Sequence, residues 1–158
     1  MGTESRDAPG PAMAFPERRR TQRLRIYWER IRRDRAFPAM RDIDPERLPV
    51  EWADCFVIAD VVRTPRFEYV GKSLTLDCGR DLTNRPVAAA PPATLIGQST
   101  SGVAEVLSSR TPVVVEGEFQ HASGPVLQYR SIILPFSDNR QTIDCLVGAA
   151  TWRRAEND

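Results

Sequence analysis

Residues 113–152, VVVEGEFQHASGPVLQYRSIILPFSDNRQTIDCLVGAATW, decide the fold. Three runs rich in β-branched residues are separated by HASG and SDNRQ, a pattern typical of strands joined by short turns. We therefore expect an antiparallel meander with one buried side and one wet side. In its first strand the expected buried side holds Val113, Val115, Gly117 and Phe119, and the wet side holds Val114, Glu116, Glu118 and Gln120.

Two more strands are expected earlier in the chain. CFVIADVV at 55–62 is short, apolar and β-branched, and FEYV at 67–70 follows after a short turn, which favours an antiparallel pair. Residues 71–92 predict short helical turns, and TLIGQSTSGVAEVLSSR at 94–110 predicts a glycine-weakened helix that packing must hold. The resulting fold class is α+β, with helices covering one face of five antiparallel strands.

The amino-terminal part separates into a tail and a basic helix. Residues 1–17 contain several prolines and glycines and few large apolar side chains, which predicts a disordered tail. A basic amphipathic helix is expected within 18–38, and its apolar face consists of Leu24, Tyr27, Trp28 and Ile31. Residues 17–35 carry nine arginines and three acidic side chains, although the net charge of the whole chain is only +1.

Length and composition limit the protein classes to be considered. A chain of 158 residues, 41% of them hydrophobic, suits a single domain with a buried core. No apolar run approaches the roughly 18 residues of a membrane helix, and the first twenty residues lack a secretory apolar stretch. We expect a cytoplasmic protein with no membrane partner. The scattered Cys55, Cys78 and Cys145 predict buried free thiols and no metal site.

Several short motifs occur in the order of a known family. They are Tyr27-Trp28, then RDIDP at 41–45, YVG at 69–71, GRDLT at 79–83 and ILPFSDN at 133–139. Together they resemble the small single-domain PAS-like family common in alphaproteobacteria, over roughly residues 21–152. Two positions differ, because Lys72 replaces the usual threonine and Asn84 the usual glycine. The resemblance implies a sheet of strand order 2-1-5-4-3, a PAS-like domain at 39–153 and a tail at 154–158.

The resemblance also implies a function that rests on binding rather than catalysis. A stand-alone sensory or regulatory module would hold a small molecule or a protein partner and signal through its amino-terminal helix or a homodimer. With no second domain expected, an unidentified signalling protein would receive the signal. The implied ligand pocket is lined by Phe56, Ile58, Leu82, Leu95, Val103, Val115, Ile132 and Val147. The implied interface consists of Leu24, Tyr27, Trp28 and Ile31, whose aromatic rings supply contact area.

Motifs for known cofactors are not found. Haem-binding PAS domains use a histidine in the helical region, which has none here. Flavin photosensors use an Asn-Cys-Arg-Phe type motif, whereas Cys78 is followed by Gly-Arg-Asp. Gly71-Lys72-Ser73 resembles the end of a phosphate-binding loop, but such a loop needs a glycine at position 66, which is arginine. The cofactor, if there is one, is therefore left open.

Two other classes of function remain as alternatives. A small pocket enzyme of the α+β barrel type would need an acid–base pair, but His121 is the only histidine and is expected in a surface turn. Glu116 and Glu118 are expected to be solvated, and Tyr129 and Arg130 could meet an anion or an acidic cross-strand neighbour. A nucleic-acid-associated protein would use residues 18–35. That helix could instead face the sheet, an acidic partner or a membrane surface.

Overall fold

The computed structural model describes residues 15–139 and 141–155. Helix α1 spans Phe15–Arg32 and ends before Arg33, whose φ of 59° is left-handed and breaks the helical path. The helix thus begins earlier and ends earlier than the sequence pattern predicts. Most of the predicted amino-terminal tail, residues 1–14, lies outside the described residues, as do residues 156–158 of the other tail.

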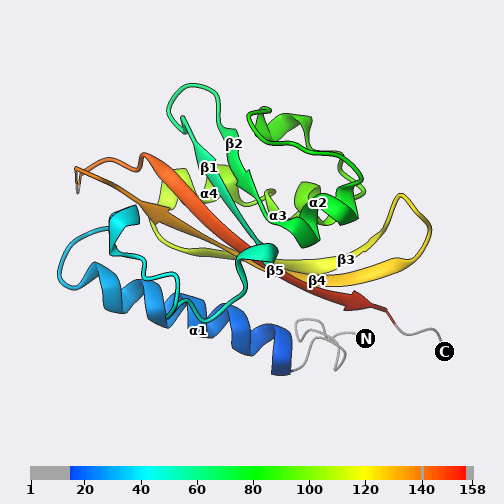
Figure 1. Ribbon diagram of the computed structural model, residues 1–158, viewed down its shortest axis with the longest axis horizontal. Coiled ribbons are helices and arrows are strands. Elements are labelled where there is room, and N and C mark those ends of the chain that lie inside the picture. The colour runs from blue at the N-terminus through cyan, green and yellow to red at the C-terminus, as the bar shows by residue number, and fades with distance from the viewer. Residues whose placement is uncertain (1–14, 140, 156–158) are drawn as a thin grey trace.

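Five antiparallel strands form one sheet in the order β2-β1-β5-β4-β3 (Figure 1), which confirms the predicted fold class. The carboxyl-terminal strand β5 lies in the centre of the sheet, between β1 and β4. The strands are β1 (Cys55–Ala59), β2 (Arg66–Val70), β3 (Val113–Gln120), β4 (Val126–Phe136) and β5 (Cys145–Arg154). The three strands expected in 113–152 are all present.

In the part of the chain that the structure describes, three short α-helices and three 3-10 turns accompany α1 and the sheet. They are α2 (Lys72–Cys78), α3 (Leu95–Ser99), α4 (Val103–Ser109), η2 (Met40–Asp42), η3 (Trp52–Asp54) and η4 (Val87–Ala89). The single helix expected at 94–110 is divided in two. Gly102 lies at the division, and a Cβ there would come within 2.8 Å of the Val115 side chain. The glycine therefore lets the chain approach β3 closely.

The two faces of the sheet are covered by different helices (Figure 1). Ser131 on β4 donates a hydrogen bond to the carbonyl of Ser99 in α3, whereas the neighbouring Arg130 reaches Thr21 in α1. Since successive side chains of a strand point to opposite faces, α1 lies on one face and α2–α4 on the other. This arrangement corrects the expected wet side. Of the three carboxyl-terminal strands, β4 and β5 are buried on both faces over most of their length, and only β3 keeps an exposed face.

Within the described part of the chain, no helix is both long and apolar enough to cross a bilayer.

Candidate functional site

The residues expected to line one pocket belong to two faces of the sheet. Phe56 pairs with Gly148 and Ile58 with Leu146, on the face of α2–α4, where Leu82, Leu95, Val103 and Val115 also lie. Ile132 and Val147 lie on the face of α1, because strand alternation sets them opposite to Ser131 and Gly148. The prediction of one shared pocket is therefore wrong, because Ile132 and Val147 cannot line the same cavity as the other six residues. Phe56, Ile58, Leu82 and Leu95 are almost fully buried and belong to the core itself.

The expected interface residues are likewise inside the molecule. Leu24, Tyr27 and Trp28 are buried in the core cluster, and half-buried Ile31 packs against that cluster. The Tyr27 hydroxyl accepts a hydrogen bond of 2.9 Å from the backbone N–H of Asp44. The apolar stripe of α1 therefore meets the chain's own sheet, which corrects its assignment to a homodimer. Of the alternatives considered for this helix, packing against the sheet is the one observed.

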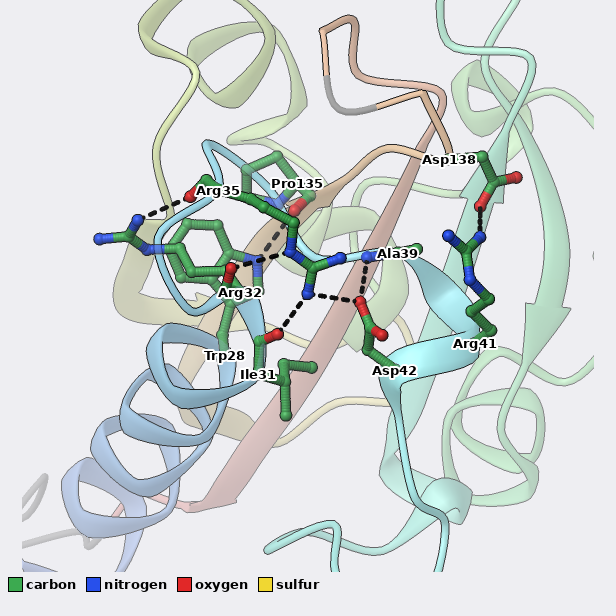
Figure 2. A network of polar contacts seen from close by, with 9 residues as sticks. All are labelled: Trp28, Ile31, Arg32, Arg35, Ala39, Arg41, Asp42, Pro135 and Asp138. Carbon is green, nitrogen blue, oxygen red and sulfur yellow. Dashed lines mark hydrogen bonds and ion pairs between the residues drawn. The ribbon is translucent and has the colours of Figure 1, made fainter.

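A polar network fastens the carboxyl end of α1, as Figure 2 shows. Arg35 folds back on the helix and donates to the carbonyls of Ile31 (2.6 Å) and Arg32 (3.0 Å), which satisfies acceptors that a helix end leaves free. Its guanidinium also pairs with Asp42 at 2.8 Å, and Asp42 accepts from the N–H of Ala39. The helix end is thus tied to the segment that returns the chain to the sheet.

The charge state of Asp42 follows from this network. Burial by itself raises the pKa of Asp42. The hydrogen bonds from Ala39 and Arg35, with the positive charges of Arg35 and Arg41, outweigh that effect and hold the pKa below its ordinary value. Asp42 belongs to the RDIDP motif, and its pairing with an arginine seven residues earlier is the kind of contact that sequence reasoning missed.

A second polar anchor lies near the other end of the helix. The Nε of Arg130 donates to the Thr21 hydroxyl at 2.8 Å, and its Nη1 pairs with Glu116 on the neighbouring strand. Glu116 and Arg130 are directly opposite in the register of β3 and β4. The cross-strand pair considered for Arg130 is therefore confirmed, and it leads to a helix contact that the strand pattern did not reveal.

One cavity lies between α1 and the sheet. It has a volume of about 210 Å³ and is bordered by α1, by the segment before β1 and by β5. Its lining consists of Arg20, Pro49, Val50, Glu51, Asp54, Ala149, Ala150 and Thr151. Charged groups of both signs surround small apolar side chains, so the cavity can hold a small polar molecule in contact with helix and sheet together.

Two open hollows flank the same helix. The first, of about 200 Å³, is lined by Arg23, Ile26, Tyr27, Arg30, Arg47 and Pro49. The second, of about 380 Å³, lies past the helix end and is lined by Arg33, Asp34, Arg35, Arg41 and Asp42. The surface around α1 is therefore both hollowed and predominantly basic.

His121 is not the surface turn residue that the sequence predicts. Only 9% of its side chain is exposed, and its Nε2 lies 2.9 Å from a carboxylate oxygen of Asp77 in α2. The two atoms are close, but the contact does not have the geometry of a well-aligned hydrogen bond. Asp77 also accepts from the N–H of Leu95 at 2.8 Å. Together the two side chains fasten the β3–β4 turn to the helical layer.

His121 contacts both Ser123 and Asp77, but the three side chains do not form a nucleophilic triad. The Ser123 hydroxyl is 2.9 Å from the His121 Nδ1, yet the backbone N–H of Ser123 donates to the same nitrogen at 3.0 Å. A general base needs that lone pair for the nucleophile alone. The contacts are those of a local turn, and they support a structural role for His121.

Two of the three cysteines, Cys55 and Cys145, offer little reactivity. Burial raises the pKa of Cys55 to about 12, and the negative charges of Asp54 and Glu51 add to this effect. Burial also raises the pKa of Cys145 to about 12, with the carboxylate of Asp144 contributing. Among residues 15–139 and 141–155, no group of three His, Cys, Asp or Glu side chains is placed to hold a metal ion.

Comparison with known proteins gives a family. The PAS domain family matches residues 17–151 of the chain. No curated protein matches it in sequence. Similar solved structures include the LOV domain of a blue-light activated histidine kinase from Erythrobacter litoralis EL346, with 11% identity, 64% of this chain and 95% of that chain covered, and a TM-score of 0.47.

Two further structures have comparable scores. The light-state LOV domain of the photoreceptor Aureochrome1 has 10% identity, coverages of 68% and 84%, and a TM-score of 0.48. The PAS domain of the fruit-fly ELK potassium channel has 11% identity, coverages of 63% and 85%, and a TM-score of 0.45. At these identities the likeness says nothing about what this chain binds.

Proposed function

We propose that this chain, which belongs to the PAS domain family, is a sensory or regulatory module that acts by binding and uses helix α1 as its output. The observation that carries the proposal is the position of α1. It lies across β4 and β5, is fastened near each end by a polar contact, and borders a cavity whose other walls are the sheet and residues 49–54. A molecule in that cavity touches the output element and its support at once.

The α1 cavity is a better candidate for an effector than the space between the sheet and α2–α4. An interior ligand would have to displace Phe56, Ile58 and Leu95, each fully buried, and exposing such side chains costs about 1.5–3 kcal/mol apiece. The cavity beside α1 requires no such displacement. An effector that prefers the docked helix to the released one shifts the equilibrium between them by its difference in affinity.

Within the family, we place the chain with the small single-domain PAS-like proteins of alphaproteobacteria, on the motifs at 41–45 and 79–83. An unidentified signalling protein is its proposed target. A homodimer through Leu24, Tyr27, Trp28 and Ile31 would require α1 to leave the sheet, because those side chains are covered by it.

The test combines ligand screening with hydrogen exchange. A library of small polar metabolites is screened for thermal stabilisation of the full chain, and the amide exchange of α1 is then measured with each compound that stabilises. We expect slower exchange in α1. Val50→Phe, which fills the cavity from a half-buried loop position, should remove both effects. Stabilising compounds that leave α1 exchange unchanged, or that act equally on Val50→Phe, would overturn the proposal.

A further inference from the structure

One edge of α1 forms a groove with the segment that follows it. Arg23, Ile26 and Arg30 are exposed there, and the buried Tyr27 also lines the groove. Arg23, Ile26, Tyr27 and Arg30 line this groove and are spaced i, i+3, i+4 and i+7, which places them on one side of the helix. Arg47 and Pro49 form the opposite wall. We call these six residues the basic groove.

The charges of the basic groove are largely uncompensated. Within the described residues, neither Arg23 nor Arg30 takes part in an ion pair. Arg47 lies 3.4 Å from Asp44, but both side chains are at least half exposed, so their attraction is weak. The groove therefore carries positive charge available to an anionic partner.

An exposed apolar side chain lies between these charges. Ile26 is 55% exposed and lines the groove with Pro49. The apolar stripe of α1 that includes Leu24 and Trp28 is already covered by the sheet, so Ile26 is not part of the fold's own packing. Contact with a partner would remove this apolar surface from water.

We propose that the basic groove binds an acidic helical segment of a partner protein. Arg23 and Arg30 are seven residues apart, which corresponds to about 10 Å along a helix. Carboxylates at positions i and i+7 of a partner helix match that spacing, and apolar side chains at i+3 and i+4 then lie over Ile26 and Pro49. This inference rests on the proposed role of α1 as the output, and it states the chemistry of the partner.

Other anionic surfaces match the groove less well. A membrane-surface helix buries an apolar face in lipid, but the apolar face of α1 is buried against the sheet. Nucleic acid would engage the arginines through phosphates and would have no use for Ile26 between them. The contribution of Ile26 therefore distinguishes a helix from a polyanion.

The test uses a fluorescein-labelled synthetic helix with glutamates at i and i+7 and leucines at i+3 and i+4. Binding to the full chain is followed by fluorescence anisotropy at low and physiological salt. We expect the double variant Arg23→Gln with Arg30→Gln to raise Kd by about tenfold, as the loss of two exposed charge pairs implies. Ile26→Ser should weaken it by about threefold with the salt dependence unchanged.

Matched controls remove the same charge elsewhere. Arg63→Gln with Arg80→Gln alters two exposed arginines beside β1, β2 and α2, and should leave Kd unchanged. Because Arg23, Arg30 and Ile26 are all exposed, the variants should keep the melting temperature of the parent chain, which is checked alongside. A peptide with glutamines in place of the glutamates should not bind.

Several results would overturn the inference. Equal weakening by the Arg63 and Arg80 control would show non-specific attraction, and so would a 20-nucleotide DNA that binds more tightly than the helix. An Ile26→Ser variant that binds like the parent would exclude the helix-on-helix contact, as would preferential binding to phosphatidylserine vesicles. If the peptide does not bind, a slowing of α1 amide exchange by an effector can still be observed, so the two proposals fail separately. If the peptide binds but no compound slows α1 exchange, only the proposal of an effector in the α1 cavity is overturned.

Discussion

The indole Nε1 of Trp28 donates a hydrogen bond of 2.8 Å to the carbonyl oxygen of Pro135, which lies 107 residues further along the chain. The pairing of β3 with β4 ends at Val113 and Ile133. Pro135 therefore lies where the sheet offers no neighbour on that side, so its missing N–H costs nothing and its carbonyl is free for α1. A single side chain of the helix completes the hydrogen bonding of the sheet.

Trp28→Phe keeps an aromatic ring but removes the donor. Because Trp28 is only 4% exposed, the carbonyl of Pro135 loses its partner, and we expect a loss of about 1–3 kcal/mol in the free energy of unfolding. Urea denaturation measures it. Trp52→Phe is the matched control, since Trp52 is half-buried and meets Tyr69 edge-on. Equal losses in the two variants would contradict the role given to this hydrogen bond.

Gly148→Ala should disrupt the middle of the sheet. A Cβ at this position would come within 2.1 Å of the ring of Phe56, which is completely buried. We expect a loss of about 1–3 kcal/mol or a failure to fold, as for other overpacked cores. Gly117→Ala is the control on edge strand β3, where the new methyl would lie 3.7 Å from Tyr129 in ordinary contact. A Gly148→Ala variant with the free energy of unfolding of the parent would contradict this prediction, because it would show that the core around Phe56 can rearrange.

Asp42 should make stability depend on acid pH. Its pKa lies below the ordinary value of 3.8, so the folded carboxylate contributes stability that is complete above that pH. The contribution disappears as the pH falls through the lower, folded-state pKa. We expect Asp42→Asn to be less stable than the parent at pH 7, with the difference shrinking below about pH 4. Urea titrations at several pH values measure this, and a constant difference would rule it out.

The buried thiols should resist labelling. With pKa values raised to about 12, Cys55 and Cys145 remain protonated at pH 8 in the folded protein, and the thiolate is the reactive form. We expect a disulfide reagent to modify half-buried Cys78 alone under native conditions and all three cysteines in urea. The raised pKa values also predict declining stability above about pH 9, where unfolded thiols lose protons that folded ones keep. Rapid native labelling of a Cys55-only variant would contradict this account.

The strands and their alternation were predictable from the sequence. A period of two is a local property of the chain, so the runs in 113–152 identified β3, β4 and β5 and the correct partition of faces within β3. The apolar stripe of Leu24, Tyr27 and Trp28 likewise identified α1 as a helix with one buried side. The resemblance of its motifs then supplied the strand order, which local patterns cannot supply.

What covers each surface was decided only by the tertiary structure. The sequence shows that Ile132 and Val147 are apolar, but only the docking of α1 places them away from Phe56, on a face that the pattern of β3 suggested was wet. His121 is buried because Asp77, 44 residues earlier, is brought beside it by the packing of α2. The burial of a side chain is set by its neighbours in space, and those neighbours come from distant segments of the chain. The local periodicity of the sequence contains no information on which segments meet.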